Sequence, residues 1–126
     1  MSALNENAVT VLSRTTGVDL NSAVATELMR VPYGFKAIIN SVVIYGADTS
    51  LTTASYSFGY NDPDYDNVIA NATHTELVDA TVLVRLPAKA GAKIGVSGDQ
   101  FKIIANTVQG AAATVSIDVL GYLIKN

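Results

Sequence analysis

Cysteine and tryptophan are both absent from this chain of 126 residues. Without cysteine the chain has no disulfide framework, no thiolate nucleophile and no cysteine-ligated zinc. Its length suits one domain, and a domain of this size buries about two-thirds of its unfolded surface. We therefore expect the chain to fold without covalent or metal cross-links.

Charged residues are scarce, at 15% of the chain against about 25% in an average soluble protein, whereas hydrophobic residues make up 49%. The net charge is −3, and the basic residues are scattered from Arg14 to Lys125. Nucleic-acid binding needs a clustered basic surface, so we expect no nucleic-acid partner. The low charge content favours burial of outer surface against other subunits, and it equally suits a small neutral β-domain.

Long hydrophobic runs are also missing. The apolar runs are short, such as residues 42–45, so the sequence predicts no membrane span. The N-terminal residues 1–17 have no basic segment leading into an apolar core, so we expect no signal peptide. The sequon at Asn71 would matter only in a secretory pathway.

Alternation of apolar with polar residues is the main positive signal. In residues 54–60 the aromatic residues occupy every second position, so we expect Tyr56, Phe58 and Tyr60 to face the core. Residues 113–124 alternate in the same way and place Ile117 on the inner face. Period-two patterning predicts strands rather than helices.

About eight or nine short strands are predicted, with turn signals every 8–12 residues or so. The predicted strands are residues 8–12, 24–31, 35–46, 54–60, 68–72, 81–86, 93–96, 100–105 and 113–124. Asn40 and Ser41 interrupt the third of these and predict a β-bulge. We expect the last two strands, which flank a loop of small residues, to form a β-hairpin. Residues 13–22 are rich in turn formers and predict a loop or extended arm, and residues 73–80 could hold a helical turn.

This pattern predicts an all-β fold, an antiparallel β-sandwich built as a jelly roll of about eight strands. An immunoglobulin-like sandwich is the alternative, although its antibody form has a buried Trp and a Cys pair that this chain lacks. We expect residues 1–22 to form an N-terminal arm with the first strand, and residues 23–126 to form the jelly-roll domain.

Catalytic motifs are weak in this sequence. His74 is the single histidine, and no Gly-x-Ser-x-Gly motif accompanies it, so we predict a loop residue rather than a catalytic base. The three glutamates do not adjoin aromatic residues suited to stacking on a sugar. We therefore expect no enzyme and no cofactor.

A calcium loop is the one metal hypothesis. Asp62, Asp64 and Asp66 have a spacing similar to that of calcium ligands, but Asn67 and Thr73 stand where an EF-hand needs Gly and Glu. An Asp-Pro turn is the preferred interpretation. A calcium site completed by other loops stays open as the alternative.

The order of these signals resembles that of a known class of proteins. The matching segments are residues 31–39 (VPYGFKAII), the aromatic strand, residues 86–91 (LPAKAG), residues 98–101 (GDQF) and residues 115–122. Together they resemble small jelly-roll structural proteins of tailed bacteriophages, in particular capsid decoration (cement) proteins. Receptor-binding and carbohydrate-binding jelly rolls, as in phage fibres, share these short motifs and are the alternative.

The resemblance implies a structural virion protein on the capsid surface, made in the host cytoplasm and without catalytic activity. Such proteins often form homotrimers and tie neighbouring capsomers together, so the expected partner is the major capsid protein or another virion protein. The N-terminal arm is expected to reach a neighbour, to whose sheet edge part of it could add a strand. The predicted partner-binding residues are Val9, Val11, Leu12 and Arg14 in this arm, and Tyr60 and Tyr65 near loops.

Overall fold

The computed structural model describes residues 8–61 and 63–126, which form eight strands and no helix. The strands are β1 (Thr10–Asp19), β2 (Thr26–Arg30), β3 (Phe35–Tyr45), β4 (Ser55–Tyr60), β5 (Ile69–Ala72), β6 (Val84–Pro87), β7 (Gln100–Thr107) and β8 (Thr114–Lys125). The all-β prediction is confirmed.

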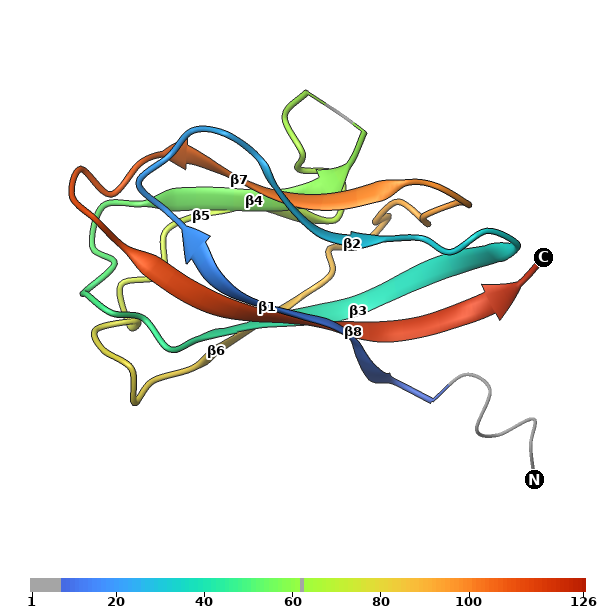
Figure 1. Cartoon of the computed structure of the whole chain (residues 1–126), viewed down its shortest axis with the longest axis horizontal. Coiled ribbons are helices and arrows are strands. Elements are labelled where there is room, and N and C mark those ends of the chain that lie inside the picture. Colours follow the sequence, from blue (N-terminus) through green and yellow to red (C-terminus); the bar gives the residue numbers. More distant parts are fainter. Residues whose placement is uncertain (1–7, 62) are drawn as a thin grey trace.

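Two four-stranded antiparallel sheets lie face to face, as Figure 1 shows. Sheet A has the strand order β1-β8-β3-β6, and sheet B has the order β2-β7-β4-β5. Successive strands alternate between the sheets, except that β4 and β5 are neighbours in sheet B. This double Greek key is the jelly roll that the sequence predicts.

The predicted hairpin between the last two strands is wrong. β7 lies between β2 and β4 in sheet B, whereas β8 lies between β1 and β3 in sheet A. The connection between them crosses from sheet to sheet and is held by Leu20, whose carbonyl accepts from Gln109 N (3.0 Å) and whose N–H donates to Ala113 O (2.9 Å). Alternation alone does not distinguish a hairpin from two strands that face each other across a core.

β1 also extends further than the sequence predicts. Residues 13–19, expected as a loop or arm, pair with β8 as far as Asp19, opposite Thr114. The strand accommodates its turn-forming residues because the pairing with β8 shifts register between Thr15 and Val18, where Gly17 has a φ of 65°. Pairing with β8 therefore overrides the local preference for a turn. In residues 73–80 the chain forms turns instead of a helical segment.

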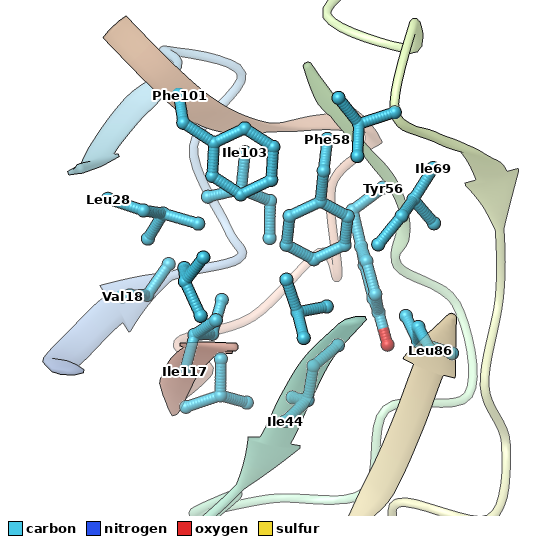
Figure 2. Close-up of a cluster of buried hydrophobic side chains, with 14 of the residues drawn as sticks. Val18, Leu28, Ile44, Tyr56, Phe58, Ile69, Leu86, Phe101, Ile103 and Ile117 are labelled. Carbon is cyan, nitrogen blue, oxygen red and sulfur yellow. The ribbon is translucent and has the colours of Figure 1, made fainter. Parts of the chain in front are cut away.

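The core lies between the inner faces of the two sheets, as Figure 2 shows. Tyr56, Phe58 and Tyr60 are fully buried, as predicted, and Phe58 stacks on Phe101 with 6.2 Å between ring centroids. Ile117 projects into this layer from sheet A. Burial of such aromatic and branched side chains supplies the main driving force for folding.

The bulge predicted at Asn40 is confirmed, because the pairing of β3 with β8 shifts register between Ile39 and Ser41. The Asn40 carbonyl accepts a hydrogen bond from Ala88 N at 2.9 Å. The bulge lets residues 35–39 and residues 41–45 both keep an apolar inner face.

Candidate protein–protein interface

The outer faces of the two sheets differ in character. On sheet B, Asn106 of β7 donates to Asn71 Oδ1 (2.9 Å) and to Ser57 Oγ (3.1 Å), so this face is polar and internally hydrogen-bonded. The segment after β4 also covers it: Ser57 Oγ donates to Asp64 O, and Lys102 Nζ lies 5.5 Å from the Tyr65 ring centroid. This face of sheet B is largely satisfied by the chain itself.

The outer face of sheet A is apolar towards the end of the sandwich that holds the C-terminus (Figure 1). On β8 the residues Val119 and Gly121 are buried, so Leu120 and Tyr122 between them point outward. Strand pairing places Val11 of β1 beside Leu120, and Ile38 of β3 beside Tyr122. Leu120 faces Ser41 on β3, but Leu120 and Tyr122 adjoin each other along the outer side of β8, so the two pairs form one apolar patch across three strands.

Residues 94–96 extend this face beyond β3. Ala37 and Gly95 exchange two backbone hydrogen bonds of 2.9 and 3.0 Å. Gly95 faces the core, because a Cβ there would lie 2.7 Å from Cζ of Tyr60. Ile94 and Val96, on either side of Gly95, therefore face outward, and Ile94 falls opposite Ile38 in this register.

We call this surface the apolar face. It consists of Val11, Ile38, Ile94, Val96, Leu120, Tyr122 and Ile124. Four of its side chains are 41% to 49% exposed, namely those of Val11, Ile94, Val96 and Ile124. Val9, the residue before β1, has a similar exposure of 47%. Large contiguous apolar patches on small proteins mark sites of protein or ligand contact. The apolar face is therefore the candidate functional site of this chain.

A polar cluster borders the apolar face on the same side of sheet A. Arg14 donates to both carboxylate oxygens of Asp118, from Nε and Nη2, at 3.0 Å each. Tyr45 donates its hydroxyl to Asp118 Oδ1 at 2.8 Å. Hydrogen bonds from Arg14 lower the pKa of Asp118, and the bond to Asp118 raises the pKa of Tyr45. The cluster links β1, β8 and β3 across the sheet.

The apolar face carries positive charge. Lys36 lies within it, paired in register with Ile124, and Arg85 lies at its margin, where it donates to Asn40 Oδ1 at 2.9 Å. We next consider the outer rows of sheet A, the outward-facing residues that lie level with residues 118–124 of β8. Among those that the structure describes, Asp118 carries the only carboxylate, and this carboxylate already accepts hydrogen bonds from Arg14 and Tyr45.

The predicted partner-binding residues take different positions. Val9 and Val11 are exposed beside or within the apolar face, whereas Leu12 packs against the core. Arg14 is exposed and paired with Asp118. Tyr65 is half-buried beneath Lys102. Tyr60 has 0% exposure, so its ring is part of the core and does not reach a partner.

Ile38, Ile94 and Tyr122 were not predicted from the sequence as surface residues. For Tyr122 a signal was present in the last strand, where apolar residues occupy both faces at Leu120 and Tyr122. The contribution of Ile94 had no local signal, because it depends on one backbone pairing with β3.

His74 lies away from the apolar face and contacts the core. Its Nδ1 is 3.0 Å from the Tyr56 hydroxyl, and burial lowers the pKa of His74 while Glu76 opposes this effect. Among residues 8–61 and 63–126 no group of three His, Asp or Glu side chains could hold a metal ion. Asp62 of the calcium hypothesis lies outside the described residues. The same residues include no helix able to cross a membrane.

The fold is similar to that of chains in two phage capsid structures. One belongs to the acid-stable capsid of Helicobacter pylori bacteriophage KHP30, with a TM-score of 0.58, 12% identity and coverage of 95% of this chain and 98% of that one. The other belongs to the capsid asymmetric unit of cyanophage Pam1, with a TM-score of 0.56, 20% identity and coverage of 94% and 87%. No protein-family model matches the sequence, and no curated protein matches it significantly.

Proposed function

We propose that this chain is a structural protein of a phage virion and acts through protein–protein contacts in the capsid. The observation that carries the proposal is the jelly roll itself, which matches two phage capsid chains over nearly the full length of each partner. Fold similarity alone permits several functions. The apolar face supplies the second support, because it gives the chain a surface suited to adhesion.

The specific role that we propose is decoration: the chain binds the outside of the shell, contacts the major capsid protein or another virion protein, and catalyses nothing. It is made in the host cytoplasm and assembles as a homotrimer. The N-terminal part of the chain contacts a neighbour through the exposed Val9 and Val11, while Thr10–Asp19 stays paired with β8 in its own sheet. Such contacts stabilise a shell through many copies, each burying about 1,600 Å² if its interface has the standard size.

Electron cryomicroscopy of the native particle tests this role. We expect density for the jelly roll on the outer surface of the shell, with its copies in groups of three. Particles that lack the chain, or that hold it only in a fibre or in the interior, would contradict the decoration role. Sedimentation of the isolated chain separately distinguishes a trimer from the 13.2 kDa monomer.

Receptor or carbohydrate binding is the second candidate, and one exposed ring favours it. Tyr33, between β2 and β3, is 92% exposed. Its loop is fixed by Gly34, whose N–H donates to Ser97 Oγ (3.0 Å) and whose carbonyl accepts from Asn126 N (2.8 Å). A rigid exposed aromatic ring can stack on a sugar. Saturable binding on a glycan array that Tyr33→Ala or Tyr65→Ala abolishes would favour this function over decoration.

A further inference from the structure

The apolar face combines exposed aliphatic side chains with two cations, Lys36 and Arg85, that have no carboxylate partner within the part of the chain that the structure describes. Lys36 lies between Ile124 on β8 and Val96 on the segment beside β3. Any partner that covers these aliphatic groups also removes water from around the Lys36 ammonium. Burial of a charge without an opposite charge costs several kcal/mol or more, so the partner must supply an acceptor.

The described residues of a second copy of the same face supply no free carboxylate for this purpose. Asp118 is the only carboxylate of these described rows, and its two oxygens already accept hydrogen bonds from Arg14 and Tyr45. Face-to-face packing of two copies would bury both Lys36 ammonium groups and bring both Arg85 side chains close, with no free carboxylate from residues 8–61 and 63–126 of these rows between them. The charge pattern therefore disfavours a two-fold dimer through this face.

The edges of sheet A are also poorly suited to pairing with a strand of another molecule. β1 is a long edge strand, but its pairing with β8 has two register shifts, between Val11 and Ser13 and between Thr15 and Val18. The opposite edge strand, β6, has four residues. Bulged and short edge strands resist addition of another strand. The face of sheet A, rather than its edge, is the surface suited to contact.

We propose that the apolar face docks on a surface of a different protein, in which apolar side chains are flanked by Asp or Glu carboxylates. The inference rests on the proposed function, under which that protein is a subunit of the capsid shell. Ile38, Ile94 and Tyr122 form the apolar centre of the contact. Lys36 pairs with a carboxylate of the partner near the centre, and Arg85 does so at the margin. Residues from β8, β3 and the 94–96 segment build this surface, so only the folded chain presents it.

The test measures binding of the purified chain to capsid shells that lack it, by cosedimentation at low and high salt. We expect Lys36→Glu and Ile94→Thr each to weaken binding by about tenfold or more. The matched controls are Lys102→Glu on the outer face of sheet B and Val24→Thr in the exposed loop between β1 and β2. Both controls should bind like the wild type. Lys36→Gln should reduce the salt dependence of binding.

The outcomes separate the two proposals. If the wild-type chain does not bind the shells, the capsid function fails, and this inference fails with it. If the wild-type chain binds and Lys36→Glu and Ile94→Thr bind equally well, the capsid function stands and the inference is overturned. Isolated chain that forms dimers which Lys36→Glu and Ile94→Thr dissociate would also overturn it. Thermal unfolding of each variant identifies any loss of fold, and Val96→Thr then replaces Ile94→Thr.

Discussion

The side chain of Asn67 forms hydrogen bonds with both backbone groups of Tyr60, as a neighbouring β-strand would. Its side-chain amide accepts a hydrogen bond from Tyr60 N at 2.8 Å and donates one to Tyr60 O at 2.9 Å. The segment that carries Asn67 packs closely against β4, because a Cβ atom at Gly59 would lie 2.8 Å from the carbonyl carbon of Tyr65. One amide thus satisfies both backbone groups at the end of a buried strand.

Asn67→Ala should therefore destabilise the fold. The substitution leaves the Tyr60 N–H and carbonyl without these partners, and we expect a loss of about 1–3 kcal/mol in the free energy of unfolding. Urea denaturation followed by circular dichroism measures it. Thr75→Ala, at an exposed turn position, is the control and should change stability by no more than about 0.5 kcal/mol. Equal stability of the two variants would show that the amide is dispensable.

Gly121→Ala should also be destabilising. Gly121 lies on the inner side of β8, and a Cβ there would overlap the carbonyl oxygen of Ile38 on β3. The two central strands of sheet A would have to separate, so we expect a cost of about 1–3 kcal/mol. Thermal unfolding measures the effect, with exposed Ala111→Ser as the control. A variant with unchanged stability would mean that β3 and β8 separate at little cost.

The Arg14–Asp118 pair should contribute to stability only above acidic pH. Hydrogen bonds from Arg14 lower the pKa of Asp118 in the folded chain. The Asp118 carboxylate therefore becomes protonated at a higher pH in the unfolded chain than in the folded chain. The stabilisation is therefore complete above the unfolded pKa of about 4 and is lost as the pH falls through the folded value. Arg14→Gln should be less stable than the wild type at pH 7, and this difference should shrink below about pH 4. A difference that stays constant across this range would rule out the linkage.

His74 should make the fold less stable in mildly acidic solution. Burial lowers the pKa of His74, so the unfolded chain binds the imidazole proton more readily than the folded chain. Stability should therefore fall as the pH decreases through the unfolded value of about 6.5. His74→Gln should remove this dependence, since His74 is the single histidine. Glu76→Gln should strengthen it, because the Glu76 carboxylate raises the pKa of His74. Unfolding midpoints between about pH 7.5 and 5.5 test both variants.

Local sequence was sufficient for the strands whose two faces differ. The aromatic residues of β4 and the inner residues of β8 were predicted correctly, since alternation directly determines which side chains share a face. The bulge at Asn40 was also predicted, because polar residues interrupt an apolar run. These features depend only on neighbours along the chain.

The apolar face shows where local sequence was insufficient. Val11 and Leu120, or Ile38 and Ile94, are far apart in the sequence and come together only through pairing between strands. The burial of Ser57 has the same origin, since a segment seven residues further on covers its hydroxyl. No local pattern specifies which segments will be neighbours.

The sequence by itself determined that this chain forms short strands around an apolar core, because side-chain direction in a strand has a period of two residues. Only the tertiary structure decided that β7 and β8 lie in opposite sheets, that residues 13–19 join β8, and that one outer face remains apolar and positively charged. The physical reason is that partner choice depends on burial and hydrogen bonding summed over the whole sandwich, and the same alternating strand satisfies its own preferences equally well in either sheet.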